Sequence, residues 1–399
     1  MTVAITGLGL ACGAGYGRDA FETALFEAPN LVGVLLRKGR VAPDGSAPFI
    51  GVEMPDPPDV LPRRLARHAT LPARVAMAVL DEAWNDANLD AVAPERIGVI
   101  VGGSNLAERE QDLEKATYAK RLDYVPPSHA YVFLDTDVCG LACAHRPIRG
   151  FAQTVGAASA SGSAAIIAGV HAIRTGRADA CIVIGIFNDP GSHDLQALRA
   201  SGAMGSARYA RTPERACRPM DKDRDGFIYG ESCAALVLQA DTADRCHGVI
   251  RGVGQTVDGT RGPQPGTDGQ VAAVLRAIAD AGIAVRDIDH VSAHATGTPA
   301  GDDTELTSLR RLDLQHARIN ATKSILGHPL AAAGAVELAA VLVQMGRSRL
   351  HANRNLVTPL DDQFAWVGQS SEPHMFRHSL KLSFGFGGIA TALIVGPGR

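Results

Sequence analysis

The sequence predicts an α/β protein with a buried sheet. Short apolar runs that suit buried strands alternate along the chain with longer runs in which apolar residues recur near helical spacing. The chain has 399 residues, of which 46% are hydrophobic and 20% charged. That composition fits a globular protein and excludes intrinsic disorder, and the length predicts two or three structural units.

The first half of the chain is expected to contain four strands and two helices. The helix over 67–87 is supported by Leu71, Val75 and Val79, which lie near helical spacing. The run 97–101 is short and apolar and ends in two glycines, which is typical of a buried strand. In order, the expected elements are the strand Val3–Leu10, the helix Arg67–Ala87, the strand Ile97–Val101, the helix Ala164–Ile173 and the strands Ala180–Ile186 and Ala234–Leu238.

The second half repeats this rhythm. Its expected elements are the helix Val271–Ala281, the strand His290–Ala293, the helix Ala331–Met345 and the strands Leu380–Ser383 and Ala392–Val395. No clean sequence repeat accompanies this alternation of strands and helices, so an internal duplication is a hypothesis at this point. The polar stretch Asp241–Arg245 marks the expected seam between units 1–240 and 241–399. The polar, Gly- and Pro-rich stretches 104–130 and 187–218 are expected to form caps, walls or a subunit contact.

Charge and cysteine usage narrow the function classes. The net charge is −3, so the chain is not expected to bind nucleic acid, and an anionic partner must meet a local basic patch. No apolar run reaches the roughly 20 residues of a membrane span, and Val3–Gly7 lacks the pattern of a secretory signal. The seven cysteines are scattered without a Cys-x-x-Cys pair, which predicts reduced thiols in a cytoplasmic protein.

Two segments imitate ligand-binding loops but fail on spacing. Thr6–Gly13 follows the first strand, yet a Gly-x-Gly-x-x-Gly dinucleotide loop needs glycine at 12, where this chain has Cys12. We therefore expect a tight structural turn.

Asp221–Gly226 imitates the start of a calcium loop, but the twelfth position is Ser232 instead of Glu. We expect its acidic residues and Arg224 to form an ion network.

Ser159 is a candidate nucleophile. It lies among small residues in Val155–Ala164, just before a predicted helix. The positive end of the helix dipole and the free backbone N–H groups there favour a developing oxyanion. The alternative is an ordinary serine N-cap.

Two histidines are candidate partners of Ser159. His294 directly follows a predicted strand, where catalytic side chains collect in α/β folds, and His328 stands just before the helix 331–345. Either histidine by itself could be a satisfied core residue, but two in Gly/Thr-rich loops favour a role with a nucleophile. No carboxylate or cysteine stands at ligand spacing to either, so no zinc site is expected.

A glycine-rich segment near the C-terminus is a candidate ligand contact. Leu382–Gly388 follows a predicted strand and alternates glycine with phenylalanine. The pattern indicates a backbone that approaches a ligand closely beneath an aromatic lid. The alternative is a glycine-rich turn.

Together these motifs resemble those of the β-ketoacyl-acyl-carrier-protein synthases of the elongating type. Matching stretches cover residues 3–396 in the family's order: Ile5–Gly13, the Ser159 region, Pro219–Leu238, His294–Glu305 with Lys323–Glu337, and Ser383–Gly388. The resemblance implies the thiolase fold, in which duplicated βαβαβαββ halves form five α-β-α-β-α layers. It also implies a dimer.

The resemblance further implies roles for individual residues. His294 and His328 match the two catalytic histidines, and Lys323 matches the lysine that orders the site. Thr296 and Thr298 match residues that contact the pantetheine arm, and Phe386 matches the gate that completes an oxyanion hole with Ser159. Glu337 matches the partner of Lys323, and Arg224 and Asp225 match structural supports. The expected docking surface for an acidic acyl carrier protein consists of Arg63, Arg64 and Arg67, with Arg208 and Arg211. No metal, nicotinamide or flavin is implied, because the carrier protein brings the 4′-phosphopantetheine. A solvated charged face is the alternative interpretation of the arginines.

The chain departs from the family pattern at the nucleophile. The family has Ala-Cys-Ala-Ser-Ser where this chain has Ala-Ser-Ala-Ser-Gly over 158–162, and Ala295 and Ile389-Ala390 also differ from the usual residues. A thiol with a pKa of about 8.5 supplies thiolate near neutral pH. An alcohol needs a general base instead, for which His294 and His328 are candidates.

Three activities stay open. The leading interpretation is a serine-dependent acyltransferase, or a slowed condensing enzyme, that acts on carrier-protein thioesters in fatty acid or polyketide biosynthesis. The second is a catalytically silent subunit that shapes the chain-length cavity of a Cys-bearing partner in a heterodimer. The third is a malonyl-thioester decarboxylase, which needs only oxyanion stabilisation from the histidines. A substrate-trapping serine variant of an ordinary synthase would carry the same residues.

Overall fold

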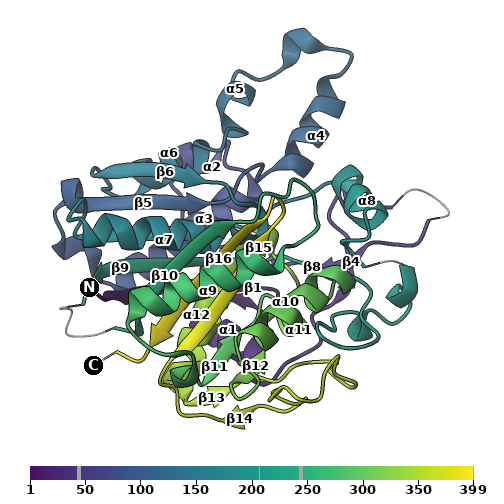
Figure 1. Ribbon diagram of the computed structural model, residues 1–399. Coiled ribbons are helices and arrows are strands. Elements are labelled where there is room, and N and C mark those ends of the chain that lie inside the picture. Colours follow the sequence, from purple (N-terminus) through teal and green to yellow (C-terminus); the bar gives the residue numbers. More distant parts are fainter. Residues whose placement is uncertain (43–45, 206, 242–245, 399) are drawn as a thin grey trace.

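The core of the protein contains two groups of five strands each (Figure 1). This count covers the residues that the structure describes. The structure is a computed structural model that describes all residues except 43–45, 206, 242–245 and 399. The first group consists of β1 (Val3–Cys12), β5 (Ile97–Gly102), β6 (Phe151–Val155), β7 (Ala180–Gly185) and β9 (Cys233–Ala240). The second consists of β10 (Gly248–Val257), β11 (His290–Ser292), β12 (Arg318–Asn320), β15 (Ser379–Gly385) and β16 (Ile389–Gly396).

The two groups have the same topology. In each, the strands lie side by side in the order third, second, fourth, fifth and first along the chain. The second strand pairs in parallel with the third and fourth in both halves. The fourth strand pairs antiparallel with the fifth, and the fifth with the first. The structure therefore confirms the duplicated α/β fold that the resemblance implies.

The strands β1 and β10 join the two halves into one sheet. Three antiparallel pairs connect them, Val3 with Ile250, Ala4 with Val249 and Ile5 with Gly248. The short β2 (Gly15–Tyr16) pairs with the end of β1 and brings the sheet to eleven strands within the described residues. The predicted boundary at 240 falls between β9 and β10 and stays a prediction, because the sheet is continuous across it. Of the expected seam, 242–245 lie outside the described residues.

Helices on both sides of the sheets complete the five layers (Figure 1). They are α7 (Ser161–Arg174) and α12 (Ala333–Arg347) between the two halves of the sheet, α3 (Leu71–Asp86) outside the first half, and α9 (Thr267–Ala281) and α10 (Pro299–Arg311) outside the second. The central pair packs closely because a Cβ on Gly334 would lie 2.2 Å from the backbone nitrogen of Ser163. The window Leu330–Arg347 is long and apolar enough to span a membrane, but 83% of it is buried, as in a core helix of a globular protein.

Glycines in the first strand of each half let a helix lie directly on the strand. A Cβ on Gly9 in β1 would lie 1.8 Å from the carbonyl oxygen of Val79 in α3. A Cβ on Gly254 in β10 would lie 2.0 Å from the carbonyl oxygen of Ala273 in α9. The predicted tight turn over Thr6–Gly13 is therefore wrong for most of that segment, since β1 runs through it and its glycines serve helix packing.

Most expected elements are present with shifted ends. The helix expected over 67–87 begins as α3 only at Leu71, with Pro72 in its first turn, and a separate short helix α2 (Arg63–Ala66) precedes it. The strands β6, β10 and β12 and the helix α10 are present although the sequence pattern does not predict them. The remaining elements are α1 (Arg18–Phe26), α11 (Lys323–Leu326), the small sheet of β3 (Gly33–Val34), β4 (Ile50–Val52) and β8 (Tyr229–Gly230), and the pair β13 (Arg349–Leu350) and β14 (Glu372–Pro373).

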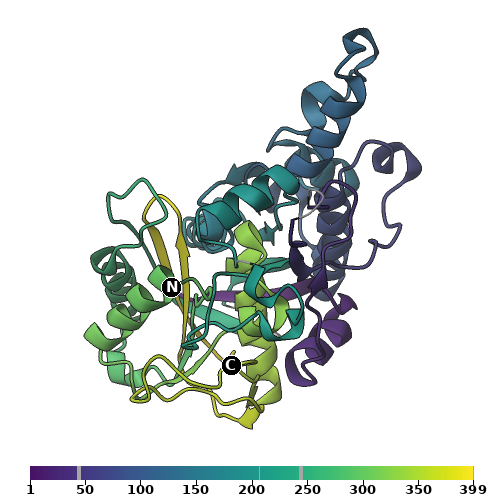
Figure 2. The same cartoon turned by 90° about the vertical axis from the view of Figure 1, so that its right-hand side faces the viewer.

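The two predicted insertions form helical excursions from the sheets. The stretch 104–130 contains α4 (Glu108–Tyr118) and the start of α5 (His129–Val132), which together form an arm that stands clear of the body in both views (Figures 1 and 2). It leads into α6 (Asp137–His145), and the stretch 187–218 contains α8 (Ser192–Ala200). Large apolar side chains are exposed on the arm, with Leu122 at 74% and Tyr124 at 69%.

Candidate active site

Ser159 lies in a sharp connection between a strand and a helix. It follows β6 in the single turn 158–160, directly before α7. Ala158 takes a left-handed φ of 48°, a strained backbone conformation for a residue with a Cβ that is frequent at functional turns. The strand β15 presses against this connection, since a Cβ on Gly385 would lie 2.3 Å from the carbonyl oxygen of Ala157. The half-buried Ser159 side chain is thereby held at the wall of a cavity.

Ser159 and the two predicted histidines meet in one cavity of about 530 Å³. His294 follows β11, and His328 lies between α11 and α12; both side chains are buried. Ser159 Oγ and His328 Nε2 are 3.0 Å apart, and the two imidazole rings lie 5.7 Å apart between centroids, nearly perpendicular. The geometry allows both rings to face one small group bound beside Ser159.

Lys323 orders His294. Its ammonium donates hydrogen bonds to His294 Nδ1 at 3.2 Å and to the His294 carbonyl oxygen at 2.6 Å, and it forms a buried ion pair with Glu337. Burial holds the pKa of His294 well below its usual value, and the positive charge of Lys323 adds to the effect. The neutral ring therefore accepts at Nδ1 and carries its proton on Nε2, as a hydrogen-bond donor.

His328 is also neutral but has no orienting partner. Burial is the main cause that holds the pKa of His328 well below its usual value, and the positive charges of Lys323 and Lys381 lower it further. Within the described part of the chain, its buried Nδ1 has no hydrogen-bond partner. In serine hydrolases the histidine beside the nucleophile has a carboxylate on its second nitrogen, which stabilises the imidazolium formed when it takes the serine proton. Among the described residues His328 lacks that support, which leaves Ser159 less activated than the nucleophile of such a hydrolase.

Aromatic rings enclose the imidazoles. Phe384 meets His294 edge-to-face with ring centroids 5.4 Å apart, and Phe227 meets His328 in the same way at 5.1 Å. Phe386, predicted as the gate, also lines the cavity and is 47% exposed. Apolar rings packed against both imidazoles lower the polarity of their surroundings, which strengthens electrostatic effects at the site.

The predicted pantetheine contacts line the same cavity. Thr296 and Thr298 both reach it, with their hydroxyl oxygens 2.9 Å apart. The backbone of Gly297 between them accepts a hydrogen bond from Gly226 N at 2.9 Å. The Thr296–Thr298 loop is thus tied to the segment that contains Arg224 and Asp225.

The calcium-like segment forms an ion network. Arg224 pairs with Asp303 at 2.6 Å and approaches Asp302 at 3.8 Å. Asp221 pairs with Arg218 and accepts backbone N–H groups at 357 and 358. The oxygens of Asp221 are therefore occupied by protein donors. Across the described residues, no group of three or more His, Cys, Asp and Glu side chains is placed to hold a metal ion.

Glu305 is a buried support that the sequence analysis did not single out. Its carboxylate accepts the backbone N–H groups of His294 at 2.7 Å and Ala295 at 2.6 Å. Ala295 has a φ of 30°, in the region where glycine is favoured. The two hydrogen bonds hold this strained peptide and so orient His294. Glu305 lies inside a matched stretch, but its role depends on a contact that the sequence does not show.

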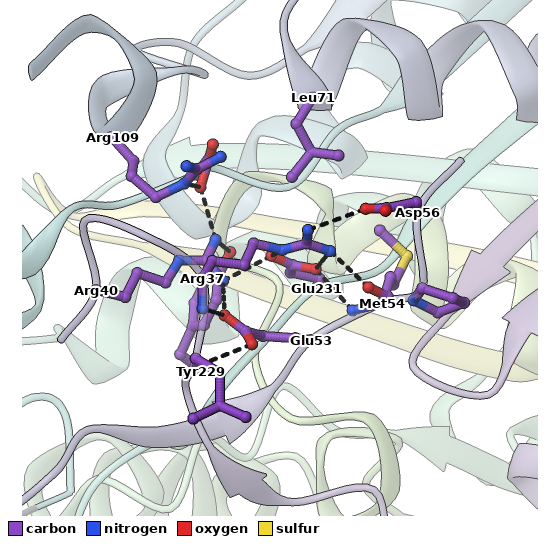
Figure 3. Close-up of polar contacts among 12 residues, drawn as sticks. Arg37, Arg40, Glu53, Met54, Asp56, Leu71, Arg109, Tyr229 and Glu231 are labelled. Carbon is purple, nitrogen blue, oxygen red and sulfur yellow. Dashed lines mark hydrogen bonds and ion pairs between the residues drawn. The ribbon is translucent and has the colours of Figure 1, made fainter. Parts of the chain in front are cut away.

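A buried arginine network packs behind another wall of the cavity, and Figure 3 shows its polar contacts. Arg40 is fully buried and pairs with Glu53 at 2.9 Å, Glu231 at 2.7 Å and Asp189 at 2.6 Å. Tyr229 lies beside Arg40 and donates its hydroxyl hydrogen to the carbonyl oxygen of residue 188 at 2.7 Å. The residues on either side of Asp189 line the cavity, so the network positions that wall.

The predicted docking arginines lie away from the cavity. Arg63, Arg64 and Arg67 are exposed at α2, and Arg64 borders a separate groove against α5 and α6. None of the three is among the described residues that line the cavity with Ser159. Arg208 pairs with Asp223 at 3.0 Å on the surface. In a single chain the basic helix is therefore not at the site that holds the histidines.

Comparisons with known proteins agree with this geometry. The N-terminal domain model of β-ketoacyl synthases matches residues 1–243, and the C-terminal domain model matches 247–357. The polyketide biosynthesis malonyl-ACP decarboxylase PksF of Bacillus subtilis is 41% identical over 98% of this chain and 96% of its own length. The 3-oxoacyl-[acyl-carrier-protein] synthase 2 of Mycobacterium bovis is 31% identical over 81% of this chain and 80% of its own length. The crystal structure of a β-ketoacyl synthase from Burkholderia phymatum superposes with a TM-score of 0.90 at 25% identity, covering both chains fully.

Proposed function

Because the chain belongs to the β-ketoacyl synthase family, we propose that it acts on acyl-carrier-protein thioesters and that its reaction is the decarboxylation of a malonyl thioester. One observation carries the proposal: two neutral imidazoles face the position beside a serine that is less activated than a hydrolase nucleophile. This site can stabilise an enolate but is poorly equipped to form an acyl-enzyme. The 41% identical relative, named as a malonyl-ACP decarboxylase, supports the same choice among the three activities left open by the sequence.

The reaction needs an oxyanion site and a desolvated carboxylate. When the bond between the α-carbon and the carboxylate breaks, carbon dioxide leaves and the electron pair moves into the thioester carbonyl, which becomes an enolate oxygen. His294 Nε2–H and His328 Nε2–H donate to that oxygen. The enolate carbon then takes a proton from water and gives an acetyl thioester. No side chain changes its covalent state, so a poorly activated Ser159 is compatible with every step.

The wall formed by α4 and α8 suits a short acyl group. Glu108 and Asp194 line the cavity there. Burial, together with the negative charge of Asp194, raises the pKa of Glu108 to about 7. A long aliphatic chain placed against these carboxyl groups would desolvate them without a compensating hydrogen bond. A malonyl or acetyl group is too short to impose that cost.

A dimer and a carrier protein are the proposed partners. The edge strand β6 is half-exposed, and Leu122, Tyr124 and Leu134 expose apolar side chains on or beside the arm. We propose that a second copy of the chain covers this surface. We also propose that the exposed arginines of α2, which lie beside α5 and α6, attract an acidic carrier protein. All seven cysteines, each a described residue, are free thiols, which supports the proposed cytoplasmic location.

The test uses the full chain and malonyl-loaded carrier protein. We expect carbon dioxide release, and intact-mass spectra of the carrier should show acetyl replacing malonyl. His294→Ala and His328→Ala should each lower the rate by about 100-fold or more, the range measured for the loss of one oxyanion donor. Acetyl-loaded carrier protein is the control and should not change in mass. A wild-type protein that binds the malonyl carrier without releasing carbon dioxide would contradict the proposal.

A second candidate, acyl transfer through Ser159, rests on the 3.0 Å contact between Ser159 Oγ and His328 Nε2. It predicts an acyl adduct on the chain, visible by intact mass and absent from Ser159→Ala. The remaining activity, that of a silent partner subunit, predicts neither an adduct nor carbon dioxide. The same mixture of chain and loaded carrier therefore separates the three.

A further inference from the structure

A second buried lysine lies behind the histidines. Lys381 on β15 has 0% exposure. Its ammonium donates to the carbonyl oxygen of Leu382 at 2.6 Å and to the hydroxyl of Ser383, and it lies 2.7 Å from Glu337 Oε2. Among the described residues, two hydrogen bonds and one ion pair therefore hold the ammonium. The ammonium is thus fixed in place without contact with solvent.

Lys381 and Lys323 share one carboxylate. Lys323 binds Glu337 Oε1, whereas Lys381 binds Glu337 Oε2. One negative charge therefore faces two positive charges among buried side chains. Burying an unbalanced charge lowers the free energy of unfolding, so this cost must be offset by a favourable interaction elsewhere.

The next carboxyl group does not cancel this excess. Glu305 faces the same cluster from α10, but its two oxygens are bound to backbone N–H groups of the His294 loop instead of an ammonium. Burial raises the pKa of Glu305 to about 7, which weakens its negative charge near neutral pH. The other described titratable groups that interact with the cluster are His294, His328, His351 and the thiol of Cys217, and burial keeps all four neutral.

The excess charge is connected to the oxyanion donors. The path runs from Lys381 through Glu337 to Lys323, and from Lys323 to His294 Nδ1. The charge of Lys381 lowers the pKa of both histidines. It therefore opposes formation of imidazolium and favours any negative charge that appears on the cavity side of the rings.

Building on the proposed decarboxylation, we propose that Lys381 is a positioning residue that makes the site select an anionic, malonyl-type thioester over its neutral acetyl product. The unbalanced ammonium behind the imidazoles is compensated when a malonyl carboxylate enters, and then by the enolate oxygen as the carboxylate leaves. The neutral acetyl thioester offers no compensation and dissociates. Lys381 itself touches neither substrate nor product.

Two substitutions of Lys381 separate charge from packing. Lys381→Met removes the charge at similar length, and Lys381→Arg keeps a charge that does not titrate below pH 12. Ser163→Ala is the matched control, because Ser163 Oγ lies 3.0 Å from Ser383 Oγ and the change trims the same buried network without altering charge. The measurements are the rate of carbon dioxide release from malonyl carrier protein against pH, and the affinities for malonyl and acetyl carrier protein.

Burial lowers the pKa of Lys381 to about 8, so the wild-type rate should fall as pH rises past that value. Lys381→Met should lose this alkaline decline and be slower by roughly 10- to 30-fold near neutral pH. It should also lose most of the preference for malonyl over acetyl. Lys381→Arg should keep the rate and shift the decline to higher pH, while Ser163→Ala should resemble the wild type.

Several results would overturn the assignment. One is a decline near pH 8 that persists in Lys381→Met or Lys381→Arg; another is an unchanged malonyl preference in Lys381→Met. If Lys381→Met does not fold, the comparison of the wild type with Lys381→Arg decides, and a wild-type rate that stays flat well above pH 8 is itself a contradiction. If the wild type binds malonyl carrier protein but releases no carbon dioxide, the proposed function fails, whereas the two affinities still test the role of Lys381.

Discussion

Ser159 Oγ lies 3.0 Å from His328 Nε2, while Nδ1 of the same ring has no hydrogen-bond partner within the described residues. Ser159 and His328 are therefore placed like a nucleophile and its general base, but no described group would stabilise the imidazolium that forms when the base takes a proton. This relationship separates the two chemistries that the site could support. Enolate stabilisation needs the imidazole as a donor, whereas acyl transfer needs it as a proton acceptor.

Ser159→Ala should leave decarboxylation within about threefold of the wild-type rate, because no bond to Ser159 forms in the proposed reaction. The measurement is the initial rate of carbon dioxide release at saturating malonyl carrier protein. His294→Ala in the same assay is the matched control for a true loss. A decrease as large as that of His294→Ala would mean that the hydroxyl takes part in the reaction.

Ser159→Cys should create a reactive thiol. The N-terminal end of α7 favours thiolate, so alkylation by iodoacetamide near neutral pH should be about tenfold or more faster at residue 159 than at the native cysteines. Alkylation of the native cysteines should be slow because burial raises the pKa of all seven thiols. Peptide mapping after brief labelling measures the ratio. Labelling at 159 no faster than at half-buried Cys143 would show that this helix end does not activate a nucleophile.

The sequence predicted the parts of the site that short motifs encode. Ser159, His294 and His328 were found because each stands where a predicted strand or helix begins or ends, and those positions meet at one cavity. The resemblance added Lys323 and Glu337, which form the expected buried pair. The duplicated topology followed from the same resemblance.

The missed features depend on contacts between distant residues. Arg40 and Asp189 are 149 positions apart, and nothing near either residue in the sequence indicates that the ion pair is buried. Lys381 lies in an apolar run where a lysine suggests an exposed edge, yet the fold places it against Glu337 on another element. The strand β10 was missed because its glycines, which make room for α9, hide the strand pattern.

Glu337→Gln should be strongly destabilising. It leaves two buried ammonium groups, on Lys323 and Lys381, without a carboxylate, which should lower the free energy of unfolding by about 3–5 kcal/mol. Urea denaturation followed by circular dichroism measures the loss. The double variant Glu337→Gln/Lys381→Met should recover part of the stability, because one uncompensated charge is removed. Equal losses in the single and double variants would contradict the shared-carboxylate arrangement.

Glu108 should make stability depend on pH. Its pKa is about 7 in the folded protein, mainly through burial, against a usual value near 4.5. The folded state therefore holds the proton more tightly than the unfolded state, and stability falls as pH rises between these values. Glu108→Gln should match the wild type near pH 4 and exceed it by about 1 kcal/mol above pH 7. Urea midpoints at both pH values measure the difference. An equal difference at both would assign the effect to packing.

The apolar side chains near the arm should hold a dimer together. Leu122 and Leu134 are exposed in the single chain, at 74% and 56%. Leu122→Glu/Leu134→Glu should convert a wild-type dimer into a monomer at micromolar concentration, since burying an unpaired carboxylate in an apolar interface costs several kcal/mol. Size-exclusion chromatography with light scattering measures the mass. Met375→Glu, at a position 80% exposed and outside the arm, is the control and should stay dimeric. A double variant that also stays dimeric would place the subunit contact elsewhere.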